Sequence, residues 1–358
     1  MAEISLDHLL TFCVQQGGSD LLLKAGQPPI IRLHGDLVRM KMEPLSPEAV
    51  RRLSFAVITD EQIARFERNW ELDYAYEILD VARFRCNIMQ QRSQVSSVYR
   101  VIPYRIQSIE ELGLPDICYR LSDYPRGLVL VTGPTGSGKS TTLAAMIDYI
   151  NSTKPVHIMT VEDPVEFVHE DKQALINQRE LGRDTVSFAD ALKYVLRQDP
   201  DVILIGEMRD LETIALAITA AETGHLVFGT LHTTNAVQTV DRVIDVFPPY
   251  QQQQIRMQVS VNLVGVLSQV LCKTADHKGR VAAFETMEAI PAIRNQIREG
   301  KTHQIGSIIQ TGSKRGMTSL DQSLAQLVVD GRADETSARS KTNDIEEYEE
   351  ILRRSEQS

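Results

Sequence analysis

The segment Gly-Pro-Thr-Gly-Ser-Gly-Lys-Ser at positions 133–140 places the tightest constraint on how this chain can fold. It matches the pattern G-x-x-x-x-G-K-[S/T], with an apolar run at 127–132 before it and a predicted helix at 140–151 after it. The glycines let backbone N–H groups turn inward around phosphate oxygens, toward which the helix directs its positive N-terminal end. We predict a nucleotide site in which Lys139 reaches the outer phosphates and the Ser140 hydroxyl binds Mg²⁺. The predicted phosphate-binding residues are Gly133, Pro134, Thr135, Gly136, Ser137, Gly138, Lys139, Ser140 and Thr141.

Strands and helices alternate through the segment that contains this loop. We predict strands at 127–132, 156–161, 202–205 and 226–231, and helices at 140–151, 187–196 and 210–223. Such alternation is typical of a mainly parallel sheet with helices on both faces. After Pro248 and Pro249 we expect mostly helix, because six apolar residues follow helical spacing: Ile255, Val259, Leu263, Val266, Leu267 and Val270.

The first hundred residues predict a separate α+β unit. Ser5, Ser46 and Thr59 are typical helix caps, and strands are expected as a pair within 21–40 and singly at 72–78, 82–89 and 95–102. We therefore expect a small domain at 1–102, a linker at 103–125, an α/β domain with C-terminal helices at 126–335, and a charged tail at 336–358.

Composition narrows the class of protein. The formal net charge of −10 argues against a generally basic nucleic-acid binder. No apolar run approaches the roughly 20 residues that a membrane span needs. The N-terminus shows no signal-peptide pattern. The four cysteines lie far apart without metal-ligand spacing, so we expect reduced and mostly buried thiols at Cys13, Cys86, Cys118 and Cys272.

Acidic side chains are expected at the carboxyl edge of the sheet, where ligands bind in α/β folds. Glu207 follows the strand at 202–205 and is our predicted general base; the alternative is a surface carboxylate paired with Arg209. Most P-loop enzymes carry Asp at the place that Gly206 occupies here. Glu162 and Asp163 end the preceding strand and are candidates to orient Mg²⁺ or water; the alternative is a turn that begins at Asp-Pro.

Two histidines bracket the strand predicted at 226–231. His232 follows the strand and is expected at the same edge, whereas His225 precedes it. A catalytic role and a structural hydrogen-bonding role are both open for each of them.

Four segments together resemble the secretion and type IV pilus ATPase superfamily. They lie at 133–141, 161–167, 196–210 and 224–233, and are similar to its Walker A, Asp-box, atypical Walker B and His-box motifs. The resemblance implies a homohexamer whose subunits join a PAS-like N-terminal domain to a RecA-like ATPase domain, with ATP bound between the domains. It also implies that glycine is normal at Gly206.

The resemblance assigns further site residues. The Asp-box acid falls on Glu162 or Asp163, with Glu162 a candidate Mg²⁺ ligand beside Ser140, and the His-box residues fall on His225 and His232. Two arginines of the N-terminal domain, Arg85 and Arg100, are expected to contact phosphates; the alternative is ordinary charged positions on exposed strand faces. The stretch at 90–94 departs from the glycine-containing loop of the superfamily.

Retraction ATPases of the superfamily carry a C-terminal helix motif that residues 292–299 match except at Gln296. We expect this helix to couple the site to movement, the alternative being an ordinary amphipathic surface helix. Phe284 stands where a histidine is expected. The predicted coupling residues are Ala292, Ile293, Arg294, Asn295, Ile297 and Arg298.

The resemblance thus implies an ATP-driven motor for type IV pilus retraction and twitching motility. It implies peripheral attachment to the cytoplasmic face of the inner membrane through a pilus platform protein, and no direct contact with nucleic acid. An accessory or non-retracting paralogue, a pilus extension or type II secretion ATPase, and a RecA-type DNA motor are the alternatives. The short N-terminal part and the lone Cys272 argue against the extension and secretion class.

Overall fold

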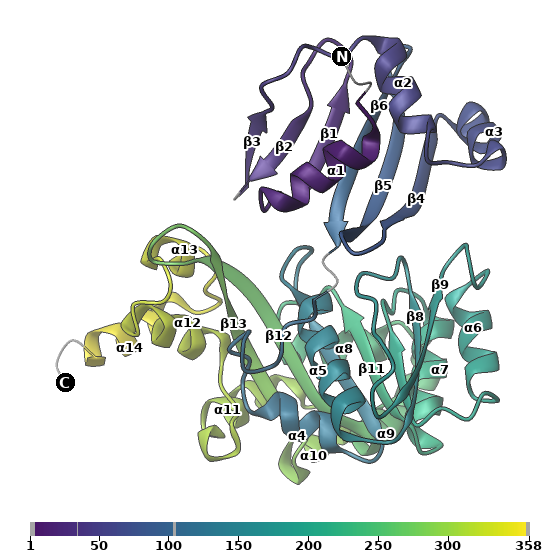
Figure 1. Cartoon of the computed structure of the whole chain (residues 1–358). Helices are drawn as coiled ribbons and strands as arrows, with labels where there is room; N and C mark the ends of the chain where they lie inside the picture. The colour runs from purple at the N-terminus through teal and green to yellow at the C-terminus, as the bar shows by residue number, and fades with distance from the viewer. Residues whose placement is uncertain (1–3, 34, 103–104, 356–358) are drawn as a thin grey trace. The chain divides into compact units, whose positions relative to one another are not determined.

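The chain forms two compact units, residues 1–105 and 106–358, which are described separately below. The computed structural model describes residues 4–33, 35–102 and 105–355 (Figure 1). None of the helices in these ranges combines the length and apolarity that a membrane span requires.

The first unit is a six-stranded antiparallel sheet with three helices on one face. The strand order is β3-β2-β1-β6-β5-β4, with bounds β1 (Asp20–Lys24), β2 (Ile30–Leu33), β3 (Asp36–Arg39), β4 (Glu71–Ile78), β5 (Ala82–Gln91) and β6 (Gln94–Ile102). The helices are α1 (Leu6–Gln15), α2 (Pro47–Phe55) and α3 (Asp60–Asn69), and each begins after a side-chain cap, Ser5, Ser46 or Thr59. Leu21, Tyr99 and Cys86 form one cross-strand row and are buried under the helices. The segment 21–40 thus holds parts of three strands rather than the predicted two.

The second unit is built on a seven-stranded sheet of order β13-β12-β7-β11-β10-β8-β9, in which only β13 is antiparallel to its neighbour. The strands are β7 (Gly127–Thr132), β8 (His157–Glu162), β9 (Leu175–Glu180), β10 (Val202–Ile205), β11 (Leu226–Leu231), β12 (Leu263–Lys273) and β13 (Arg280–Glu288). The predicted mainly parallel sheet is therefore confirmed.

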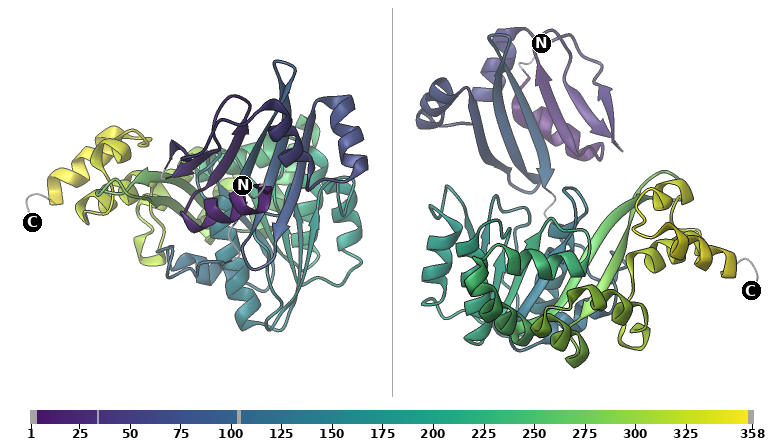
Figure 2. Two further views of the ribbon diagram at one scale, coloured as in Figure 1. Left: turned by 45° about the horizontal axis from the view of Figure 1, so that its top comes forward. Right: turned by 180° about the vertical axis from the view of Figure 1, so that it is seen from behind.

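Helices cover both faces of this sheet (Figure 2). One face packs against α4 (Ile117–Asp123) and α5 (Lys139–Thr153). The other face packs against α6 (Phe188–Val195), α7 (Leu211–Glu222), α8 (Ala236–Asp245), α9 (Pro249–Asn262), α10 (Pro291–Glu299) and α11 (Ile305–Gln310). A further apolar cluster joins β12 and β13 to α12 (Leu320–Val329), α13 (Glu335–Arg339) and α14 (Ile345–Ser355).

The helix predicted from residue 255 to residue 270 is wrong beyond Asn262. The helix α9 ends there, and the chain continues directly as strand β12. Nearly every residue of β12 is buried, because the strand lies inside the sheet with helices on both faces. A strand buried on both faces has no polar alternation, so its apolar run cannot be distinguished from a helix by periodicity.

The linker predicted at 103–125 is also wrong over its described part. Residues 106–125 belong to the second unit, and Ile109, Leu114 and the α4 residues Ile117 and Leu121 lie in its core. Gly113 lies in a turn, and the apolar residues on either side of it anchor the segment to the sheet.

The charged tail at 336–358 is folded over its described part. The helices α13 and α14 pack on α12, and Tyr348 is completely buried beside Leu324 and Cys272. The charges lie on the outer face of α14, where Arg353 and Arg354 pair with Glu349 and Glu350. The four cysteines are free and buried, as predicted.

Replacing Tyr348 tests whether α14 is part of the fold. We expect Tyr348→Ala to lower the free energy of unfolding by about 3–5 kcal/mol, because it leaves a cavity the size of an aromatic ring. Tyr348→Phe is the matched control: the Tyr348 hydroxyl is buried without a protein partner, so its removal leaves stability unchanged or slightly higher. Thermal and urea melting of both variants measure the difference. Wild-type melting of Tyr348→Ala would show that α14 does not stabilise the unit.

Candidate functional site

Four strands of the second unit end at the same edge of its sheet. The strands β7, β11, β10 and β8 run parallel, with Thr132 level with Leu231, and Ile205 level with Val161. The residues that follow each strand therefore converge there: the loop at 133–140 after β7, Glu207 after β10 and His232 after β11. Glu162, the last residue of β8, lies at the same edge.

The loop at 133–140 has the backbone shape that its glycines predict. Gly133, Gly136 and Gly138 have φ values of 143°, 77° and 91°, which side-chain-bearing residues rarely adopt. Gly133 also has no room for a side chain, because an added Cβ would lie 2.3 Å from the backbone oxygen of Gln269. Lys139 opens α5, and its Nζ donates to the carbonyl oxygens of Gly133 and Pro134 at 2.8 and 3.2 Å.

These residues fit a nucleotide phosphate. The N-terminus of α5 directs N–H groups toward the loop, and the Lys139 ammonium adds a positive charge. Burial lowers the pKa of Lys139, while the nearby carboxylates Glu207 and Glu166 act in the opposite direction. No group of three or more potential metal-ligating His, Cys, Asp or Glu side chains occurs in the described ranges. The hydroxyl of Ser140 with few carboxylates suits Mg²⁺, which usually keeps several waters and binds substrate phosphates.

Glu207 is held between two strands by its neighbours in the chain. The Gly206 N–H donates to the Val161 oxygen at 2.8 Å, and the Met208 N–H donates to the Thr230 oxygen at 3.0 Å. Gly206 packs closely on β8: an added Cβ would lie 3.1 Å from the Cα of Glu162. An aspartate at Gly206 would therefore press on β8, and the first carboxylate after β10 stands one residue later.

The Glu207 carboxylate is shared by an arginine and a histidine. Its Oε1 lies 2.5 Å from Arg209 Nε and 2.8 Å from His232 Nε2, and its Oε2 accepts from Arg209 Nη2 at 2.6 Å. Burial raises the pKa of Glu207, but the hydrogen bonds and charge of Arg209 and His232 outweigh it, so the net pKa is lowered. The alternative role for Glu207, an ion pair with Arg209, is thus present in the structure. This ion pair keeps the carboxylate ionised.

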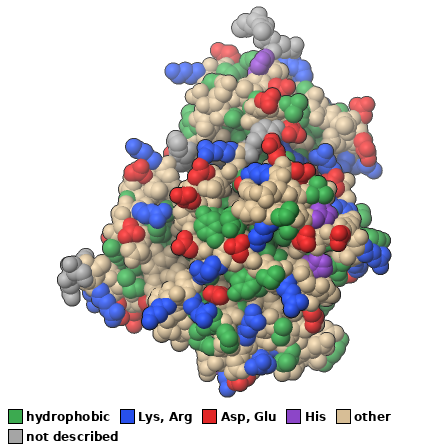
Figure 3. Space-filling view, turned by 60° about the horizontal axis from the view of Figure 1, so that its bottom comes forward, with side chains coloured by type: hydrophobic (Ala, Val, Ile, Leu, Met, Phe, Trp, Pro, Cys, Tyr) green, Lys and Arg blue, Asp and Glu red, His purple; other side chains and the backbone are tan. Residues whose placement is uncertain are grey.

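A cleft opens beside these side chains. It has a volume of about 390 Å³ and is lined by Glu207, Met208, Arg209, Leu231, His232, Thr233, Thr234, Gln238 and Arg242. On the face shown in Figure 3, positive and negative side chains are interspersed rather than gathered into regions of one sign.

Glu162 differs from Glu207 in its surroundings. Its Oε1 accepts from Thr160 Oγ1 at 2.7 Å and from Gln178 Nε2 at 3.2 Å. Burial raises its pKa, although these hydrogen bonds act in the opposite direction. Asp163 follows it as an exposed residue at a cis peptide bond to Pro164. A role for either carboxylate on Mg²⁺ or water stays a prediction.

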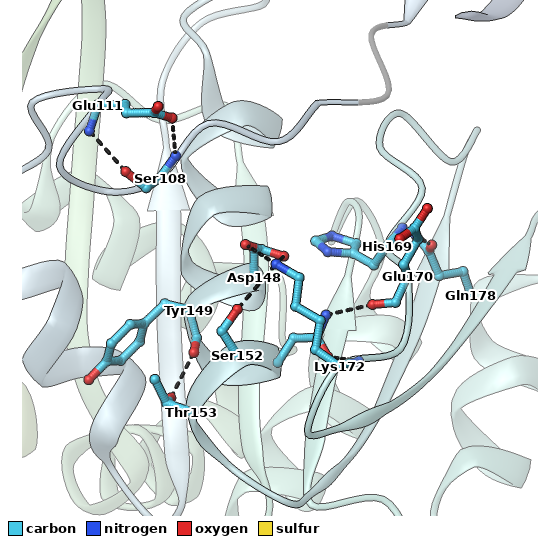
Figure 4. A network of polar contacts seen from close by, with 11 residues as sticks. Ser108, Glu111, Asp148, Tyr149, Ser152, Thr153, His169, Glu170, Lys172 and Gln178 are labelled. Carbon is cyan, nitrogen blue, oxygen red and sulfur yellow. Dashed lines mark hydrogen bonds and ion pairs between the residues drawn. The ribbon is translucent and has the colours of Figure 1, made fainter. Parts of the chain in front are cut away.

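Gln178 connects Glu162 to the loop that follows β8. It accepts from the His169 N–H at 2.8 Å and donates to the Phe167 oxygen at 2.8 Å. Figure 4 shows the same loop anchored by Lys172, whose Nζ donates to both carboxylate oxygens of Asp148 on α5 at 2.7 and 2.8 Å. No motif marks Gln178, Thr160 and Gln269 in the sequence, because they are isolated polar residues at buried or half-buried positions.

The structure does not bring His225 to this edge. His225 precedes β11 and lies at the amino end of the parallel strands, about 20 Å along the strand direction from His232. Its Nδ1 lies 2.9 Å from the Ala220 oxygen and 3.2 Å from Thr223 Oγ1, at the C-terminus of α7. Within one subunit these contacts match the structural hydrogen-bonding role, and a catalytic role for His225 stays a prediction.

Arg85 and Arg100 lie together in the first unit. They are direct partners on β5 and β6, so both side chains project from one exposed face. Arg100 Nε lies 3.0 Å from Asp20 Oδ1, and Arg32 approaches the other oxygen at 3.7 Å. A contact of these arginines with nucleotide phosphates stays a prediction.

The predicted coupling helix is α10, and its two faces are unequal. Ile293 and Ile297 are completely buried, whereas Ala292 and Arg298 are exposed. Arg294 is half-buried, and its guanidinium donates to the carbonyl oxygens of Ala289 and Leu263 at 2.7 and 3.5 Å. Arg298 donates to Asn295 on the helix surface. Phe284, in place of the expected histidine, is buried in the apolar core.

The comparisons with known proteins agree with this geometry. The family model described as type II/IV secretion system protein matches residues 81–352.

The chain belongs to this family.

The type IV pilus retraction ATPase PilT of Pseudomonas aeruginosa is 53% identical over 345 residues, which cover 96% of this chain and 100% of that protein. A twitching motility protein of Neisseria gonorrhoeae is 53% identical over 89% of this chain and 85% of its own length. The crystal structure of the pilus retraction motor PilT with bound ADP matches with a TM-score of 0.90 and 44% identity, covering 97% of this chain and 100% of that one. The predicted class is confirmed: an ATP-hydrolysing enzyme with a RecA-like α/β core and a smaller α+β domain.

Neutralising Glu207 tests its role as the general base. We expect Glu207→Gln to lower kcat at least about 100-fold, because an amide cannot accept a proton from water, while ADP affinity is retained. Glu212→Gln is the matched control, since it breaks an exposed ion pair between Glu212 on α7 and Lys193 on α6. Steady-state ATP turnover and light scattering measure activity and oligomeric mass for both. Wild-type turnover by Glu207→Gln would remove the base assignment.

Removing Arg209 tests how the site keeps Glu207 ionised. The pKa of Glu207 lies below its ordinary value of 4.5, so its acid limb in the wild-type pH profile falls below pH 4.5. Arg209→Ala removes a positive charge that lowers the pKa of Glu207, while burial, which raises that pKa, stays in place. We expect the acid limb of kcat/KM to move to higher pH, and Arg209→Lys to move it less. An unchanged profile would show that Arg209 does not control this carboxylate.

Proposed function

We propose that this ATPase powers the retraction of type IV pili and thereby twitching motility. The observation that carries the proposal is the 53% identity to the retraction ATPase PilT over that protein's full length. The site supports it, because Lys139 and Glu207 occur at the same sheet edge with the geometry described above. The C-terminal helix α10 supports it as well, since it matches the retraction motif except at Gln296.

Each side chain of the proposed site has a separate role in the hydrolysis of ATP. The loop at 133–140 binds the phosphates through backbone N–H groups, and Lys139 neutralises negative charge on the outer phosphates. Glu207 accepts a proton from the attacking water, while His232 and Arg209 hold the carboxylate in place. Ser140 and Glu162 are the residues that would hold Mg²⁺, which offsets phosphate charge when bound.

The proposed motor is a homohexamer that acts on a membrane-bound partner. Attachment is peripheral, on the cytoplasmic face of the inner membrane, through the pilus platform protein. Arg85 and Arg100 of the first unit approach the phosphates when nucleotide binds. Movement between the two units then transmits the work, with α10 as the coupling element, as closure around a ligand does in other nucleotide-driven machines.

A deletion strain tests the direction of work. We expect cells that lack this protein to be piliated but unable to twitch, because pili assemble and are not withdrawn. Wild-type protein and the control Glu212→Gln restore twitching, and Glu207→Gln does not. Microscopy of surface pili and stab-agar twitching zones are the measurements. Loss of pili in the deletion strain would indicate an extension ATPase, and normal twitching would indicate an accessory paralogue.

A further inference from the structure

A buried glutamine supports the phosphate-binding loop from behind. Gln269 lies in the middle of β12, the strand beside β7, and is only 2% exposed. Its Nε2 donates to the Ser137 carbonyl oxygen at 2.6 Å, and its backbone oxygen faces Gly133. Because a carbonyl oxygen only accepts hydrogen bonds, the amide nitrogen must be the atom that faces Ser137.

This hydrogen bond fixes the direction of one N–H group of the loop. The carbonyl of Ser137 and the N–H of Gly138 belong to the same peptide unit. A trans peptide is planar, so its C=O and N–H point in opposite directions. Gln269 draws the carbonyl toward β12, and the Gly138 N–H consequently points away from β12. Phosphate binding at such loops depends on N–H groups aimed at the anion.

The surroundings leave little freedom for this peptide. An added Cβ at Gly138 would lie 3.0 Å from Gln269 Nε2, so a side chain at that position would crowd the glutamine. Gly138 has a φ of 91°, a conformation in which a peptide flip costs little for glycine. A glycine loop therefore needs an outside contact to keep one orientation. Gln269 is the buried side chain that supplies it.

We propose that Gln269 is a positioning residue that aims the Gly138 N–H at the phosphate of the bound nucleotide. Gln269 does not touch the reacting atoms; it acts through the Ser137–Gly138 peptide. The inference rests on the proposed nucleotide site and goes beyond it, since it assigns phosphate affinity to a strand outside the motif.

Calorimetric titration of the full-length protein with Mg²⁺-ADP tests this role. We expect Gln269→Met, which keeps the side-chain length but removes the donor, to weaken ADP binding about tenfold. The control Thr286→Val removes a buried hydrogen bond from β13, where Thr286 Oγ1 donates to the Gly316 oxygen at 2.7 Å. It should lower the melting temperature and leave ADP affinity unchanged.

A second variant, Gln269→Glu, adds a pH dependence of ADP affinity that a purely structural role of Gln269 would not produce. The carboxyl introduced by Gln269→Glu can donate to the Ser137 oxygen only when protonated, and burial raises the pKa of such a group. We expect its ADP affinity, relative to the wild type at each pH, to be higher at pH 6 than at pH 8. The Gln269→Met loss should be equal at both.

The outcomes separate this inference from the proposed function. Failure of the wild type to bind ADP would overturn the nucleotide site itself. A wild type that binds ADP, with Gln269→Met and Gln269→Glu binding equally well, would overturn the role of Gln269 alone. Lower melting temperatures without any change in ADP affinity would reduce Gln269 to a packing residue.

Discussion

Parallel hydrogen bonding between β7, β11, β10 and β8 is the constraint on which the rest of the site depends. Parallel strands present their carboxyl ends at one edge, so loops far apart in the sequence meet there. The same close pairing limits what each position can be. Gly206 lies so near β8 that a side chain there would be tightly packed against Glu162, and the first carboxylate after β10 comes one residue later, at Glu207.

Glu207 and Glu162 lie at the carboxyl edge of the sheet, and their surroundings shift their pKa values in opposite directions. Arg209 and His232 outweigh burial at Glu207 and lower its pKa, whereas burial dominates at Glu162 and raises its pKa. A pair of acids whose environments separate their pKa values is a common way to divide roles within one site. The carboxylate that stays ionised suits proton acceptance, and the one bonded to Thr160 and Gln178 suits a positioning role.

The sequence predicted correctly those features that a few adjacent residues determine, and it failed for features that depend on packing between distant segments. The loop at 133–140, the caps at Ser46 and Thr59, and the strand ends beside Glu207 and His232 are each determined by a few adjacent residues, and those predictions agree with the structure. The strand β12 and the helix α4 were misread, and the packing of α14 was missed, because each is decided by what packs against it. Hydrophobic spacing is ambiguous in a strand buried on both faces, and charge on one face of α14 concealed Tyr348 on the other.

The misread strand also contacts both the predicted coupling helix and the nucleotide loop. β12 begins at Leu263, whose carbonyl oxygen accepts from Arg294 of α10, and six residues later it reaches Gln269 behind the nucleotide loop. Six residues of strand span about 20 Å. The register between β12 and β7 shifts between Leu263 and Gly265, and the pairing is regular from Gly265 to Ser268. One strand thus contacts both α10 and the Ser137–Gly138 peptide, although the two are far apart in sequence.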